Sequence, residues 1–300
     1  MSENSPKVSI VLPTYNGARY LKQSIDSCLN QSHKNIELVI VDDGSTDNTT
    51  EIIKSYKDSR IKYVRHKKNS GLPNALNTGF AHTTGEYVTW TSDDNYYSEN
   101  AVEKELLFLR ERNYPFVYCD FYRFDAEKPL NLHLVMLPDV LELEKNNDVG
   151  PCVLFSRKVL EIIGEFDPDT ELAEDYDYWI RVWKAFPMYH LAEPLYFYRD
   201  HQHSLTMSRF YEVQAVRLFV LSKNKMSYRF KVESFTYLVA RKYPKLPGVK
   251  ILAKMLAILI FKPKTTAHLL KKGTHLYYKS RKKLKSLKKS SQNLLGQNLE

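Results

Sequence analysis

The first hundred residues switch repeatedly between two hydrophobic patterns. Two short runs, Lys7–Leu12 (KVSIVL) and Ile36–Val41 (IELVIV), are almost entirely apolar, which is typical of strands buried on both faces of a parallel sheet. Between these runs the apolar residues recur every three or four positions, as on one face of a helix: Leu21, Ile25, Cys28 and Leu29. The chain therefore begins with an expected strand, a helix and a second strand.

The same alternation continues to about residue 100. Shorter strands are expected at Ile61–Val64 and Glu86–Thr91. A helix that runs through Ile52 and Tyr56 precedes the first of them, and a loop entering a helix at Gly71–Ala81 precedes the second. This alternation predicts an α/β unit with a parallel sheet and right-handed crossovers. Ligands of such sheets bind beyond the carboxyl ends of the strands. Four polar side chains follow the expected strand ends there: Tyr15, Asp43, Asp93 and Asp94.

The second half is less regular, and its pattern predicts a mixture of strands and helices. The expected strands are Phe116–Phe124, its possible hairpin partner Leu132–Leu137, Val153–Phe155 and Leu195–Tyr198. The expected helices are Glu99–Arg112, Val159–Ile163 and Leu172–Phe186. From Phe210 onward the pattern is helical again.

One expected strand ends in two adjacent carboxylates. Gly85–Tyr97 (GEYVTWTSDDNYY) is rich in β-branched and aromatic residues and then places Asp93 beside Asp94. Two unpaired anions repel each other, so a positive partner is expected, most simply a hard divalent cation. The string also suits a polar turn or a helix N-cap before Glu99–Arg112, and the pattern alone leaves both interpretations open.

Composition bounds the class of protein. The 300 residues, 43% apolar and 26% charged, suit one large globular domain or a domain with an appendage. The net charge of +9 lies in the tail, because Lys262–Lys289 holds eleven basic residues and no acid, while residues 1–261 hold 33 basic and 34 acidic ones. Three scattered cysteines favour a reducing compartment without disulfides: Cys28, Cys119 and Cys152.

The C-terminal third suggests a membrane surface. No secretory signal is expected from the polar start (MSENSPK), and no apolar run reaches the roughly 20 residues of a membrane span. Val249–Phe261 is strongly apolar but short, which suits a buried core helix or an interfacial one. The basic tail behind it favours an anionic membrane surface. Nucleic acid is the less favoured partner, and a plain solvated tail is the other alternative.

Several strings together resemble glycosyltransferase family 2, whose members use nucleotide sugars and have the GT-A fold. The strings are Val8–Leu21, Ile36–Thr49, Gly71–Gly79, Gly85–Tyr97, Gly164–Asp167 (GEFD), Ala173–Val182 (AEDYDYWIRV) and Tyr198–Ser204. Each is weak by itself, but their order and spacing make the resemblance specific over about residues 7–206. It implies an α/β fold of the GT-A type, with a Rossmann-like, mostly parallel sheet between helices. We expect a catalytic domain at 1–206, with a nucleotide-binding half at about 1–100 and an acceptor half at about 101–206. A helical extension at 207–261 and the basic tail at 262–300 follow it.

The resemblance also assigns the nucleotide side. It implies that Asp94 binds Mn²⁺ or Mg²⁺ across the diphosphate, and that Asp93 lies beside the ribose. The other nucleotide-binding candidates are Pro13, Tyr15, Asn16 and Asp43. By resemblance, Tyr15 stacks on the base and Asp43 accepts a hydrogen bond from uracil, which favours a UDP-sugar. The alternatives are that Tyr15 packs in the core and that Asp43 caps the following helix.

The catalytic assignments come from the later strings. The resemblance implies that Asp175 is the general base of an inverting single displacement, with Glu174 and Trp179 on the acceptor side. At helical spacing Trp179 is also suited to the core. Arg199 and His201 are expected on the diphosphate side, although a surface-loop histidine is the alternative.

Two residues depart from the usual family pattern. Ser92 stands where many members have an acid, and Leu76 stands where many have an arginine, so the diphosphate has fewer charged partners. We expect a metal-dependent, hexosyltransferase-like enzyme that transfers sugar from a UDP-sugar to a sugar or lipid-linked sugar, for a glycolipid or cell-surface polysaccharide. We place it in the cytoplasm, peripheral on the inner face of the membrane. The alternatives are a nucleotide-sugar-binding or membrane-interaction module without turnover, and a nucleotidyltransferase.

Overall fold

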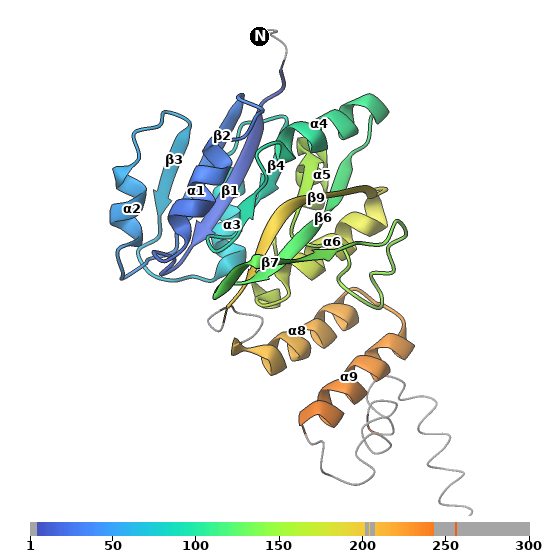
Figure 1. Cartoon of the computed structure of the whole chain (residues 1–300). Coiled ribbons are helices and arrows are strands. Elements are labelled where there is room, and N and C mark those ends of the chain that lie inside the picture. Colours follow the sequence, from blue (N-terminus) through green and yellow to red (C-terminus); the bar gives the residue numbers. More distant parts are fainter. Residues whose placement is uncertain (1–4, 202–203, 205–207, 243–255, 257–300) are drawn as a thin grey trace, which may run out of the picture. The chain divides into compact units, whose positions relative to one another are not determined.

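The computed structural model describes residues 5–201, 204, 208–242 and 256. The chain divides into two compact units, Met1–Met226 and Ser227–Glu300. Within the first unit, the N-terminal half alternates strands and helices (Figure 1): β1 (Val8–Thr14), α1 (Leu21–Leu29), β2 (Ile36–Asp42), α2 (Thr49–Ser55), β3 (Ile61–Arg65), α3 (Leu72–Ala81) and β4 (Tyr87–Trp90). The predicted α/β alternation of residues 1–100 is thereby confirmed.

The remaining strands of this unit extend the same sheet, and helices lie between them along the chain. In order, these elements are β5 (Tyr96–Tyr97), α4 (Ala101–Arg112), β6 (Phe116–Asp125), β7 (Lys128–Val135), β8 (Val153–Ser156), α5 (Arg157–Ile163), a 3₁₀ turn (Pro168–Thr170), α6 (Glu174–Ala185), β9 (Tyr189–Asp200) and α8 (Phe210–Lys223). The strand order is β3-β2-β1-β4-β8-β6-β9-β5, and β7 pairs with β6 as its hairpin partner. Strands β1 to β4 are parallel, whereas β8 runs antiparallel to both β4 and β6.

Two apolar clusters cover the two faces of the sheet. All seven residues of β1 and of β2 are buried, as their apolar sequences predict. In β1, Val8, Ile10 and Leu12 pack with α1 and α4, while Val11 on the opposite face packs with α3, α5 and α6. Because adjacent side chains of a strand point to opposite faces, an uninterrupted apolar run is what this two-sided burial requires.

The structure differs from the expected elements in the second half. β9 begins six residues before the expected strand Leu195–Tyr198, and β5 was not expected. The compact unit also continues past residue 206, because α8 buries Val220 and Leu221 in the cluster that holds α6.

The second unit is described only in part. It contains α9 (Tyr228–Lys242). The apolar segment Val249–Phe261, apart from Leu256, and the basic tail 262–300 lie outside the described residues. Among the residues described, no helix is long and apolar enough to cross a membrane.

Candidate active site

The carboxyl ends of the parallel strands meet at one edge of the sheet. The backbone N–H of Asp43, after β2, donates to the carbonyl of Thr14 at the end of β1 (2.8 Å). Two residues after Thr14, Asn16 N–H donates to Ser45 Oγ (2.9 Å), and Asn16 Oδ1 accepts from the N–H of Thr46 (2.8 Å). The loops after β1 and β2 are therefore tied together, as the predicted ligand edge requires.

Asp93 is joined to the loop after β1. Its Oδ2 accepts a hydrogen bond from Thr14 Oγ1 (2.5 Å), and a Cβ on Gly17 would lie only 2.0 Å from the same oxygen. Position 17 therefore needs glycine for this close approach. Burial, followed by the neighbouring charge of Asp94, raises the pKa of Asp93 to about 7. Our sequence reasoning missed Thr14 and Gly17, although both lie in a string that carries the resemblance.

Asp94 faces a different partner. Its Oδ2 lies 2.9 Å from His201 Nε2, which follows β9. Asp94 Oδ1 is buried and has no hydrogen-bond partner, and the same is true of His201 Nδ1. Buried polar atoms are normally satisfied, so these two atoms suit a ligand. A carboxylate oxygen is the donor that Mn²⁺ and Mg²⁺ prefer, so Asp94 fits the expected cation, whereas the imidazole of His201 is a nitrogen donor that hard Mg²⁺ takes less readily.

Arg199 contacts the backbone of Asp94. The guanidinium is buried, donates from Nε to the backbone carbonyl of Asp94 (2.8 Å), and donates from Nη2 to Gln23 Oε1 (2.5 Å). It also lies over the rings of Tyr20, at 4.2 Å, and Phe124, at 4.7 Å. Burial lowers the pKa of Arg199. Its contacts are therefore those of a side chain that fixes the turn holding Asp94.

Asp43 is enclosed by its own loop partners. The carboxylate is 4% exposed and accepts from Ser70 N–H (3.0 Å), Ser70 Oγ (2.8 Å) and Gly71 N–H (2.9 Å). His66 Nδ1 lies 2.7 Å from it as well. It makes no side-chain cap to α2, whose N-cap residue is Asn48. A uracil N–H would have to replace one of these internal donors.

The remaining nucleotide candidates lie beside this loop. Tyr15 is 47% exposed, so the alternative that it packs in the core is wrong. Pro13 is buried at the end of β1, where it pairs with Val41. Asn16 has a left-handed backbone with φ of 55°, which asparagine tolerates better than most residues. This turn leaves the Tyr15 ring accessible at the ligand edge.

Glu174 and Asp175 open α6. Asp175 Oδ2 accepts from Asn147 Nδ2 (2.8 Å), and Oδ1 accepts from the N–H of Tyr176 (2.7 Å). Burial raises the pKa of Asp175. Glu174 is buried, and its Oε2 has no partner. Burial, followed by the charge of Asp175, raises the pKa of Glu174 to about 8.

The sequence predicted Asn147, which contacts Asp175, and Trp179, which follows it in α6, to different extents. Asn147 lies in the irregular stretch 125–150, where no pattern pointed to it. For Trp179 the sequence left two interpretations, the acceptor side and the core. The side chain is 1% exposed and packs edge-on against Phe116 and Phe155, so it lies in the core. The acceptor-side assignment of Trp179 is therefore wrong, because an indole in the core offers no surface to a sugar.

The nucleotide edge and the segment leading into α6 are in contact. A Cβ on Gly71 would lie 3.1 Å from Glu171 Cδ, three residues before Glu174. In α3, Asn77 exchanges two hydrogen bonds with the backbone of Phe166, both of 2.8 Å. The loop that encloses Asp43 therefore borders the turn that presents the second pair of carboxylates.

Comparison with known proteins identifies the class and then the family. The fold resembles that of S. aureus TarS residues 1–349 in complex with UDP-GlcNAc (TM-score 0.60, 18% identity, 85% of this chain and 80% of that chain). It also resembles the mannosyltransferase PcManGT from Pyrobaculum calidifontis in complex with GDP-Man and Mn²⁺ (TM-score 0.58, 20% identity, 91% and 81%). The fold is thus of the GT-A class, as expected. The model of glycosyl transferase family 2 matches residues 9–164, and the chain belongs to that family.

Curated relatives agree with this assignment. The chain is 35% identical over 210 residues to an uncharacterized glycosyltransferase of Rickettsia prowazekii, covering 66% of this chain and 65% of the relative. It is 30% identical over 217 residues to a putative teichuronic acid biosynthesis glycosyltransferase of Bacillus subtilis, covering 70% and 85%. The chain therefore spans slightly less than two thirds of the first relative's length and most of the second's.

Proposed function

We propose that the protein is an inverting glycosyltransferase that moves a sugar from a UDP-sugar to a hydroxyl acceptor. The observation that carries the proposal is the environment of Asp94, whose buried Oδ1 has no partner and whose Oδ2 contacts His201. This arrangement suits a divalent cation at the ligand edge of a family 2 sheet. The named complexes of two similar folds contain UDP-GlcNAc and GDP-Man, which supports a nucleotide-sugar donor.

The nucleotide would bind along the loops after β1, β2 and β4. The exposed ring of Tyr15 offers a stacking surface for the base. Pro13 and Asn16 shape the loop that presents it, and Asp93 is assigned to the ribose. We assign uracil recognition to Asp43, which must then exchange one internal donor, such as Ser70, for the uracil N–H.

Asp94 would hold Mn²⁺ or Mg²⁺, with His201 as the second protein ligand or as a cover over the diphosphate. When bound, such an ion stabilises the negative charge that develops on the departing diphosphate. Arg199 acts through Asp94, since its guanidinium already binds the backbone carbonyl of that residue and Gln23. This contact fixes the turn in the orientation that the site needs.

Asp175 would accept the proton of the attacking hydroxyl. Its carboxylate is oriented by Asn147 and by the N–H of Tyr176, and its raised pKa makes it a stronger base than an ordinary aspartate. Glu174 is neutral at pH 7 and can donate a hydrogen bond to the acceptor. A single displacement with one base inverts the configuration at the sugar carbon.

The acceptor would carry an apolar part. Four side chains at alternate positions of β7 and just beyond it are exposed: Leu130 (94%), Leu132 (43%), Leu134 (50%) and Met136 (76%). An apolar row of this length in water suggests a lipid or protein contact. A lipid-linked sugar acceptor for a glycolipid or cell-surface polysaccharide, met at the cytoplasmic face of a membrane, accounts for this row and for the basic tail of the sequence.

The test is release of UDP from a panel of UDP-sugars in the presence of Mn²⁺. We expect turnover of at least one donor, loss of that turnover with a chelator, and recovery when Mn²⁺ or Mg²⁺ is restored. Absence of turnover with every donor, together with specific binding of UDP, would instead favour a nucleotide-sugar-binding module. Activity that survives chelation would contradict the metal assignment.

A further inference from the structure

The segment between Asp167 and Asp177 carries the proposed base and is conformationally strained. Leu172, two residues before Glu174, has a φ of 82°, a region that leucine rarely adopts. Such strain persists only where surrounding contacts impose it. The segment that presents Asp175 therefore needs contacts from elsewhere in the fold to hold its shape.

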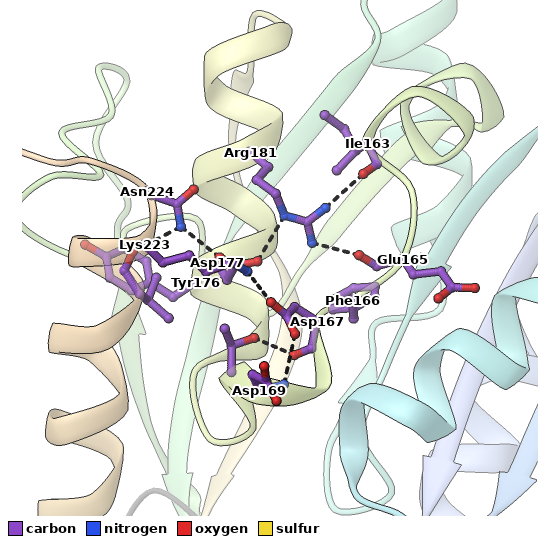
Figure 2. A network of polar contacts seen from close by, with 12 residues as sticks. Ile163, Glu165, Phe166, Asp167, Asp169, Tyr176, Asp177, Arg181, Lys223 and Asn224 are labelled. Atoms are coloured by element: carbon purple, nitrogen blue, oxygen red, sulfur yellow. Dashed lines mark hydrogen bonds and ion pairs between the residues drawn. The ribbon is translucent and has the colours of Figure 1, made fainter.

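Lys223, at the end of α8, joins the two ends of this segment (Figure 2). Its Nζ lies 2.5 Å from Asp167 Oδ2 and 2.9 Å from Asp177 Oδ1. Lys223 is the foremost cause of the lowered pKa of Asp167. One ammonium group thereby closes a loop that contains the strained Leu172 and the base.

The Asp177 end of this contact is fully satisfied. Asp177 is 0% exposed, and its Oδ1 also accepts from Asn224 Nδ2 (2.7 Å). Its Oδ2 accepts from Arg181 Nε (3.0 Å). Arg181 in turn donates to the carbonyls of Ile163 (2.9 Å) and Glu165 (2.9 Å), which precede the segment. A buried carboxylate without these cations would be left uncompensated.

We propose that Lys223, assisted by Asn224, is a positioning residue for the base Asp175. The inference rests on the proposed function, and it makes α8 a working part of the catalytic unit although the family match ends at residue 164. Lys223 acts through Asp167 and Asp177, which fix the strained turn and the first turn of α6. The acceptor hydroxyl then meets a carboxylate in a fixed place.

The test compares full-length Lys223→Met, Lys223→Arg and wild type, with Lys158→Met as a matched control at an exposed lysine of α5. We expect Lys223→Met to lower kcat about 100-fold, with KM for the donor and Kd for UDP unchanged. Lys223→Arg should recover much of kcat, because it keeps a cation between the two carboxylates. The control should match wild type.

Hydrogen–deuterium exchange supplies a readout that does not need activity. In Lys223→Met, amides of residues 168–176 should exchange faster, while those of α1 stay as in wild type. Unchanged exchange or unchanged kcat in a folded Lys223→Met would overturn the proposal. If wild type turns over no donor, the proposed function fails, and exchange still decides whether Lys223 holds the segment. If Lys223→Met does not fold, Asn224→Ala carries the same two measurements.

Discussion

The two carboxylates of a single turn differ because of the residues that they touch. Asp93 bonds Thr14 in the loop after β1, whereas Asp94 contacts His201 after β9 and leaves Oδ1 without a partner. Their adjacency in sequence indicated a cation, and the resemblance assigned Asp93 to the ribose and Asp94 to the metal. The different contacts of the two carboxylates are compatible with this proposed division. The division is what the proposed chemistry requires.

Gly17→Ala tests the close approach to Asp93. A Cβ there would lie 2.0 Å from Asp93 Oδ2, so the carboxylate must move and UDP affinity should fall about tenfold. Isothermal titration with UDP and Mn²⁺ measures the change. Gly164→Ala is the control: its φ of 77° destabilises the fold, but nothing lies within 4 Å of the new Cβ, so UDP affinity should stay the same. Equal affinity in Gly17→Ala would contradict the assignment.

Tyr15→Ala tests the stacking surface. Removal of an aromatic ring from a base costs about 1–3 kcal/mol of binding, so Kd for UDP should rise roughly 5- to 150-fold. Because the ring is 47% exposed, the melting temperature should hardly change. Tyr15→Phe keeps the ring and should bind UDP as wild type does. A Tyr15→Ala variant with normal affinity would remove Tyr15 from the site.

At the scale of elements, hydrophobic pattern predicted most of the fold. The buried strands β1 and β2 have the expected bounds within two residues, because continuous apolar runs leave few alternatives. The two-residue β5 was missed, since its pairing with β9 depends on tertiary contact. Adjacency at a strand end marked Asp93 and Asp94, and the resemblance marked Asp175, whereas Asn147 and Lys223 lie in stretches where no local pattern marks a contact partner.

Buried Glu105 on α4 should make the stability of the fold depend on pH. It is 0% exposed, and the Sγ atoms of Cys119 and Cys152 lie 3.5 Å from its Oε1. Burial raises its pKa from 4.5 to about 8. The folded state thus holds a proton that the unfolded state releases, so stability is highest below pH 4.5 for this group and is lost as pH rises to 8.

Glu105→Gln should therefore reduce the fall in the free energy of unfolding between pH 5 and pH 8. The titration of one such group changes that free energy by at most about 1.4 kcal/mol per pH unit. Urea unfolding at several pH values measures it. Glu103→Gln on the exposed face of α4 is the control and should leave the slope unchanged. The same slope in Glu105→Gln and wild type would show that Glu105 is not a neutral core residue.

At the scale of the molecule, the catalytic unit and the remainder separate at residue 226. A chain of residues 1–226 contains the whole sheet, α6 and α8, and should keep the melting transition and UDP affinity of the full chain. Flotation with anionic liposomes should occur for the full chain and be lost for residues 1–226, because the basic tail is removed. Equal flotation of both chains would refute membrane attachment through the C-terminal part.

The central claim is that Asp175 is the base of a sugar transfer, and Asp175→Asn tests it most directly. Asparagine keeps the size of the side chain, so Kd for UDP and the melting temperature should match wild type. Turnover of the preferred UDP-sugar onto its acceptor should fall by about 10²- to 10⁴-fold, the contribution of a general base. An Asp175→Asn enzyme with wild-type kcat would contradict the mechanism.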